Sequence, residues 1–132
     1  MKSLIVEDGF VSRAVLIQLL TPYGHCDVAV NGEEAIAAIQ RSLDEGAPYD
    51  VVCLDIMMPD CTGTDVLERL HEMEADAGIL LGDGAKVFMT TSSREHVLES
   101  FRANCDAYLM KPIKPEELHA LVEQHLGIPL PG

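Results

Sequence analysis

The 132-residue chain has the length of one domain, and with 48% hydrophobic residues it can bury a full core. Its formal net charge of −13 argues against nucleic-acid binding, which needs a basic surface, and against binding to anionic membranes. No apolar run reaches membrane-spanning length, and acids appear too early for a signal peptide, so we expect a cytoplasmic protein. The cysteines form no Cys-x-x-Cys pair, which argues against a disulfide framework or a zinc site.

From the N-terminus, apolar runs alternate with amphipathic stretches. An apolar run predicts a strand over 2–6, and a repeat of leucines predicts a helix over about 10–21. A second strand is expected over 26–30. Asn31 has the chemistry of a helix N-cap, and Gly46 closes the helix that follows it.

The pattern continues through the second half of the chain. The run 51–54 is rich in β-branched residues, which predicts a buried strand, and a helix is expected over about 63–74. Three glycines within 77–85 indicate an ordered loop that is longer than a typical connection. Two more strands are expected over 87–90 and 107–110.

The last two helices have their own start signals. Ser92 and Glu95 have capping-box spacing, ahead of a helix that carries Val97, Leu98 and Phe101. Pro115 suits the first position of the final helix, and Gly127 ends it.

Five strands that alternate with five helices predict an α/β fold, a doubly wound five-stranded parallel sheet with helices on both faces. In the flavodoxin-like (βα)5 arrangement the strand order is 2-1-3-4-5, and ligands bind at the carboxyl ends of the strands where that order reverses. Residues 1–127 would form this domain, and residues 128–132 a short tail.

This topology brings charged and hydroxyl side chains into one crevice. The residues at the strand ends are Glu7, Asp8, Asp55, Thr91 and Lys111. Three neighbouring carboxylates raise one another's pKa, and a divalent cation relieves their repulsion. Because the ligands are all oxygens, we expect Mg²⁺, or alternatively Mn²⁺, bound directly by Asp8 and Asp55 and through water by Glu7. Asp55 can also act as a nucleophile for a phosphoryl group, whose charge the metal, Lys111 and Thr91 would neutralise.

Each of these residues has a plainer explanation when it is considered alone. An acid at a strand end is often a turn residue or a helix cap, and a lysine before a proline is most often a solvated charge. The set argues against these explanations, because four of five parallel strands would have to end in complementary chemistry by chance.

Over almost its whole length the chain resembles the receiver (CheY-like) domain of bacterial two-component response regulators. The motifs that carry the resemblance are Leu4-Ile5-Val6-Glu7-Asp8, Leu54-Asp55-Ile56-Met57-Met58-Pro59, Val87-Phe88-Met89-Thr90-Thr91-Ser92 and Ala107-Tyr108-Leu109-Met110-Lys111-Pro112. The resemblance implies that Asp55 accepts phosphate from a histidine of a sensor histidine kinase or a phosphotransfer protein. It implies roles for the other residues as follows: Glu7 and Asp8 as the acidic pair, the Met57 carbonyl as a magnesium ligand, Thr91 and Tyr108 as the coupled switch pair, and Lys111 as a phosphoryl contact. It also implies a cis Lys111-Pro112 bond.

The resemblance further implies a signalling switch in a phosphorelay rather than an enzyme. A downstream protein would bind the face of the fourth helix, fifth strand and fifth helix, and phosphorylation-dependent homodimerisation is left open. The chain departs from the usual pattern at Gly9, Cys61-Thr62, Ser92, Asn104 and the long 78–84 connection, but none of these positions is a phosphorylation residue.

The residues fit two other functions less well. Phosphatases with an aspartyl nucleophile typically place a second aspartate two residues later, where this chain has Met57. A flavin phosphate would meet the acidic turn Asp8-Gly9 after the first strand. Two alternatives stay open: a phosphorylation-independent interaction module, and a receiver fragment of a longer regulator.

Overall fold

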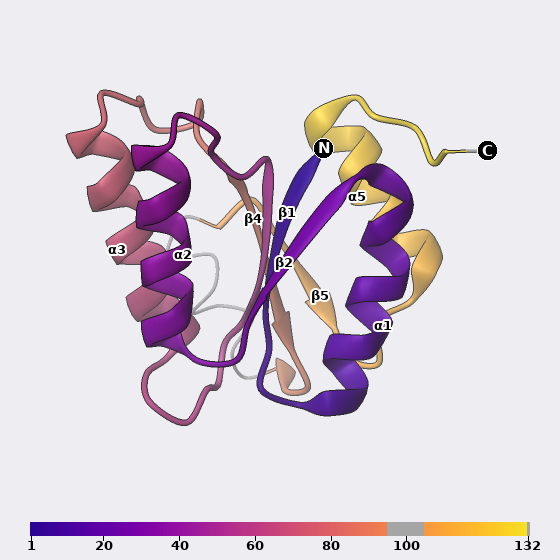
Figure 1. Ribbon diagram of the computed structural model, residues 1–132. Helices are drawn as coiled ribbons and strands as arrows, with labels where there is room; N and C mark the ends of the chain where they lie inside the picture. The colour runs from indigo at the N-terminus through magenta and orange to yellow at the C-terminus, as the bar shows by residue number, and fades with distance from the viewer. Residues whose placement is uncertain (95–104, 132) are drawn as a thin grey trace.

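Five parallel strands form one sheet in the order β2-β1-β3-β4-β5, which confirms the predicted order (Figure 1). The computed structural model describes residues 1–94 and 105–131. The strands are β1 (Lys2–Val6), β2 (His25–Ala29), β3 (Val51–Asp55), β4 (Lys86–Thr91) and β5 (Ala107–Met110). The helices are α1 (Phe10–Leu20), the short 3-10 helix η1 (Thr21–Tyr23), α2 (Gly32–Asp44), α3 (Gly63–Asp76) and α5 (Pro115–Leu126). The predicted fourth helix, with Val97, Leu98, Phe101 and Glu95 of the capping box, lies outside the described residues.

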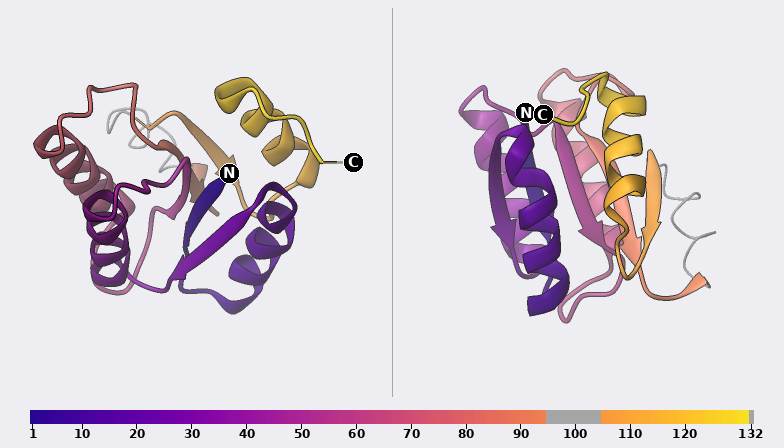
Figure 2. Two further views of the ribbon diagram at one scale, coloured as in Figure 1. Left: turned by 45° about the horizontal axis from the view of Figure 1, so that its top comes forward. Right: turned by 90° about the vertical axis from the view of Figure 1, so that its right-hand side faces the viewer.

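The helices cover the sheet on both faces. In Figures 1 and 2, α2 and α3 lie on one face, and α1 and α5 lie on the other. Because successive side chains of a strand point to opposite faces, the strands supply two cores. Leu4 and Leu54 belong to the core beneath α2 and α3, whereas Ile5 and Cys53 belong to the core beneath α1 and α5.

The central strand β3 is buried along its whole length. It pairs with β1 on one side and β4 on the other, so both of its edges are hydrogen-bonded. A strand that is buried on both faces needs apolar residues at every position. The continuous apolar run at 51–54 is the sequence signal of such a strand. This strand carries Asp55 to the carboxyl edge of the sheet.

Most helix ends follow from local sequence signals. The Asn31 side chain accepts a hydrogen bond from the Glu34 amide at 2.8 Å, as the N-cap prediction requires. Pro115 occupies the first turn of α5, and Gly127 ends it in the left-handed region at φ 68°. The second strand lies one residue earlier than predicted, over His25–Ala29, because its pairing with β1 places His25 opposite Lys2.

The long connection between α3 and β4 has an internal anchor. The buried carboxylate of Glu74 accepts a hydrogen bond from the Ala85 amide at 2.8 Å, and burial raises the pKa of this carboxyl. Leu80 and Leu81, at the tip, are exposed. Within the described ranges, no helix combines the length and apolar character needed to cross a membrane.

Candidate functional site

Strand register brings the predicted acids together. Val6 is opposite Leu54, so the residues that follow β1 meet the end of β3 at one edge. A carboxylate oxygen from each of Glu7, Asp8 and Asp55 lies within 4.8 Å of the others. Glu7 and Asp55 are buried, whereas Asp8 is exposed, so the cluster opens to solvent on one side.

Lys111 joins the cluster from the far end of the chain. Its Nζ donates to both carboxylate oxygens of Glu7, at 3.0 and 2.9 Å, and lies 3.4 Å from Asp55 Oδ2. The Lys111 amide donates to the Thr91 carbonyl at 2.7 Å, which fixes the segment beside β4. The cis Lys111-Pro112 bond matches the expectation. Because Glu7 is only 2% exposed, its charge depends on this lysine for compensation.

The environment of Asp55 makes its charge unfavourable. Burial is the largest cause and Glu7 the second, and together they raise the pKa of the Asp55 carboxyl to about 6 although Lys111 acts in the opposite direction. The sequence predicted that clustered acids would raise a pKa, and the structure adds burial as the main reason. A cation at this position would favour the charged form of Asp55.

Two further groups hold the acids in place. The Met57 amide donates to Asp55 Oδ1 at 3.3 Å. Arg13, on the first turns of α1, donates from Nη1 to the carbonyls of Glu7 and Asp8 at 3.3 and 3.2 Å. Sequence reasoning missed Arg13, because it bonds backbone carbonyls five and six residues earlier, ahead of the helix, and no side-chain pattern indicates such a contact.

The donors fit a hard divalent cation. The clustered ligand atoms are all carboxylate oxygens, and Mg²⁺ prefers such ligands together with water. In the described part of the chain, no other group of three or more histidine, cysteine or acidic residues is close enough to hold a metal. The cluster is an acidic triad of the kind that binds magnesium.

The predicted switch pair lies on adjacent strands. Thr91, at the end of β4, is buried, and its hydroxyl donates to the Ser93 carbonyl at 3.1 Å and accepts from the Ser93 amide at 3.0 Å. Tyr108 lies on β5 opposite Met89 and is 37% exposed. Among the described residues, the hydrogen bonds of the Thr91 hydroxyl therefore go to the following turn and not to the acids.

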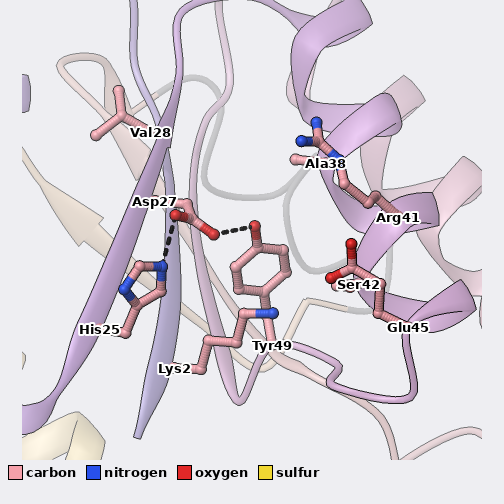
Figure 3. Close-up of a pocket in the computed structure, with 9 residues that line it drawn as sticks. All are labelled: Lys2, His25, Asp27, Val28, Ala38, Arg41, Ser42, Glu45 and Tyr49. Carbon is pink, nitrogen blue, oxygen red and sulfur yellow. Dashed lines mark hydrogen bonds and ion pairs between the residues drawn. The ribbon is translucent and has the colours of Figure 1, made fainter.

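A separate concavity of about 370 Å³ lies between β2 and α2 (Figure 3). Tyr49 donates from its hydroxyl to Asp27 at 2.6 Å, and His25 pairs with the other oxygen of Asp27 at 2.7 Å. The nine lining residues are Lys2, His25, Asp27, Val28, Ala38, Arg41, Ser42, Glu45 and Tyr49. None of the predicted site residues lines it, so it is distinct from the acidic cluster.

The chain belongs to the response regulator receiver domain family, because the sequence model of that family matches its residues 3–123. It is 35% identical over 122 residues to the positive alginate biosynthesis regulatory protein of Pseudomonas aeruginosa, covering 89% of this chain and 44% of that protein. The chain likewise spans less than half the length of other curated relatives. It is therefore a receiver domain of two-component signalling, a switch rather than a classical enzyme, and the cluster of Glu7, Asp8 and Asp55 resembles the phosphoacceptor site.

Solved structures agree with this assignment. A CheY-like receiver domain protein from Methanospirillum hungatei superposes with a TM-score of 0.77 at 28% identity, covering 96% of this chain and 93% of that one. The receiver domain of a sensor histidine kinase from Pseudomonas aeruginosa, which has a magnesium ion in its active site cleft, superposes with a TM-score of 0.78. At 20% identity, with 96% and 98% of the two chains covered, the second likeness supports the fold alone.

Proposed function

We propose that Asp55 accepts a phosphoryl group from a phosphohistidine of a sensor histidine kinase or phosphotransfer protein. The observation that carries the proposal is the convergence of three carboxylates and Lys111 at the carboxyl edge of the sheet, beside the central strand. Phosphoryl transfer depends mainly on positioning and on charge stabilisation, and this cluster supplies both.

The transfer conserves atoms and charge. An Asp55 carboxylate oxygen attacks phosphorus, the phosphorus–nitrogen bond of phosphohistidine breaks, and its electron pair returns to the imidazole nitrogen. The product is an acyl phosphate on Asp55. Lys111 Nζ, 3.4 Å from Asp55 Oδ2, is placed to offset charge on the phosphoryl oxygens.

The residues that would hold Mg²⁺, or Mn²⁺, are Glu7, Asp8, Asp55 and the carbonyl of Met57. When bound, the ion would neutralise charge on the acids and on the phosphoryl oxygens. The oxygen donors of this chain support that choice.

The proposed switch begins at Thr91. To bind the phosphoryl group, its hydroxyl would give up its two hydrogen bonds to Ser93, and Tyr108 on the adjacent strand would rearrange with it. The output surface would include β5 and α5, together with the segment of the predicted fourth helix, which lies outside the described residues. Residues 1–127 would act as the domain, in the cytoplasm, with a downstream protein as the partner.

The test is intact-mass analysis after incubation with acetyl phosphate, with and without Mg²⁺. The wild type should gain one hydroxylamine-labile phosphoryl group only when Mg²⁺ is present, and Asp55→Asn should gain none. Asp83→Asn, which removes an exposed acid on the α3–β4 connection, is the matched control and should react like the wild type. If no condition phosphorylates the wild type, the proposal fails, and a phosphorylation-independent interaction module becomes the better explanation.

A further inference from the structure

Asp60 lies at the tip of the loop between β3 and α3, yet its side chain bonds to a different helix. Its two carboxylate oxygens accept hydrogen bonds from the Gly32 and Glu33 amides of α2, at 2.9 and 3.0 Å. Asn31 takes the next amide, that of Glu34. The first amides of a helix have no partner within the helix and carry partial positive charge, so a carboxylate suits them well. Asp60 and Asn31 together satisfy the N-terminus of α2.

The loop and α2 are fitted to each other closely. A β-carbon built at Gly32 would lie 2.0 Å from Cys61 Sγ and 3.4 Å from Asp60 Oδ1. With the Cys61 side chain in this position, any larger residue at position 32 would collide with its thiol, so glycine lets the loop rest directly on the first turn of α2. In Figure 1 the loop after β3 and the start of α2 lie at the same end of the molecule, below the carboxyl ends of the strands.

The loop is also closed at its base. Met57 and Thr62 form an isolated bridge, and the Gly63 amide donates to the Ile56 carbonyl at 2.6 Å. The residues between Met57 and Thr62 therefore form a short closed turn whose tip is held by Asp60. At the base of this turn, the Met57 amide donates to Asp55 Oδ1. A shift at the tip would thus move the backbone that holds Asp55.

We propose that Asp60 is a positioning residue for the magnesium and phosphoacceptor site, acting by anchoring the 57–62 turn to the N-terminus of α2. This inference rests on the proposed function, in which Met57 and Asp55 are expected to be ligands of the magnesium ion. The two amide hydrogen bonds hold the pKa of the Asp60 carboxyl below its ordinary value, so the anchor is charged at neutral pH. Asp60 is not one of the three clustered acids, and its two carboxylate oxygens accept hydrogen bonds from amides of α2.

The experiment compares Asp60→Ala, Asp60→Asn and Glu33→Gln in the full chain. The readouts are the Mg²⁺ dissociation constant from calorimetry, the rate of phosphorylation by acetyl phosphate, and the NMR amide shifts of residues 32 and 33. Asp60→Ala should weaken Mg²⁺ binding about tenfold, the scale seen when groups that orient metal ligands are removed. Asp60→Asn should lose less, because its carbonyl oxygen still accepts one amide. Glu33→Gln removes an equal charge from an exposed side chain at the same helix end and should bind like the wild type.

Each outcome is decisive for Asp60. Suppose that in Asp60→Ala the amide signals of residues 32 and 33 move, which shows that their hydrogen bonds are lost, but the variant binds Mg²⁺ and reacts like the wild type. The anchor then does not position the site, and the proposed function still stands. If Glu33→Gln weakens Mg²⁺ binding as much as Asp60→Ala, the effect is one of charge, and the positioning role is refuted. If the wild type binds no Mg²⁺, the proposed function fails and the positioning role fails with it. Circular dichroism confirms folding, and Asp60→Asn decides the question if Asp60→Ala unfolds.

Discussion

Replacing Asp55 by asparagine should stabilise the folded protein at neutral pH. The substitution keeps the shape of the side chain and removes a charge that burial and Glu7 make unfavourable. A difference of one pKa unit between the folded and unfolded states corresponds to about 1.4 kcal/mol. A rise from 3.8 to about 6 sets an upper limit of about 3 kcal/mol. Because the cleft is open to water beside Asp8, we expect about 1–2 kcal/mol at pH 7.5 without divalent cations.

The stability difference between Asp55→Asn and the wild type should depend on pH. Between about pH 4 and 6 the folded chain binds more protons at Asp55 than the unfolded chain, so Asp55 lowers wild-type stability as the pH rises through this interval. The advantage of Asp55→Asn should therefore be complete above about pH 6 and absent near pH 4. Added Mg²⁺ should reduce it, because the ion binds the folded wild type through the acid that the variant lacks.

The assay is urea denaturation followed by circular dichroism, at pH 4 and 7.5, with a chelator and with Mg²⁺. Asp83→Asn is the control for removal of an exposed acid, and its free energy of unfolding should stay close to that of the wild type. A variant that is no more stable than the wild type at pH 7.5 in the chelator would refute the reasoning, since the Asp55 charge would then be well compensated in the folded state.

Three other substitutions test the contacts around the site by urea denaturation. Lys111→Met leaves the buried Glu7 carboxylate without its lysine and should cost about 2–4 kcal/mol at pH 7.5; an unchanged free energy of unfolding would mean that other groups compensate Glu7. Thr62→Ala removes the capping box of α3 and should cost about 1 kcal/mol, whereas Thr62→Ser should cost little, and equal losses in the two variants would speak against the cap. Gly32→Ala should cost about 1–3 kcal/mol through its overlap with Cys61 Sγ, and Cys61→Ala in the same chain should recover part of that loss. Strictly additive effects of the last two substitutions would contradict the close packing.

The sequence was most informative where the signals are local. The apolar run at 51–54 predicted the central strand because a strand buried on every side needs apolar residues throughout. Asn31 predicted the start of α2 because its side chain bonds an amide three residues later. Once the strands were placed in order, the parallel topology was sufficient to bring Glu7 and Asp55 together.

The long-range contacts that hold the site residues in position could not be predicted from local sequence signals. Asp60 bonds amides 27 and 28 residues away, and Lys111 bonds an acid 104 residues away, so both contacts depend on packing between elements. The sequence predicted Lys111 as a phosphoryl contact, but in this structure it pairs mainly with Glu7. The Thr62–Asp65 capping box is a local signal that the prediction of a helix over about 63–74 does not use.

The central claim is that Asp55 forms an acyl phosphate. The most direct measurement is borohydride reduction of the protein after its reaction with acetyl phosphate and Mg²⁺, followed by tandem mass spectrometry of its peptides. An aspartyl phosphate is reduced to homoserine, so the account predicts homoserine at position 55 and unmodified aspartate at positions 8, 50 and 60. Homoserine at another acid, or at none, would contradict the assignment of Asp55 as the phosphoacceptor.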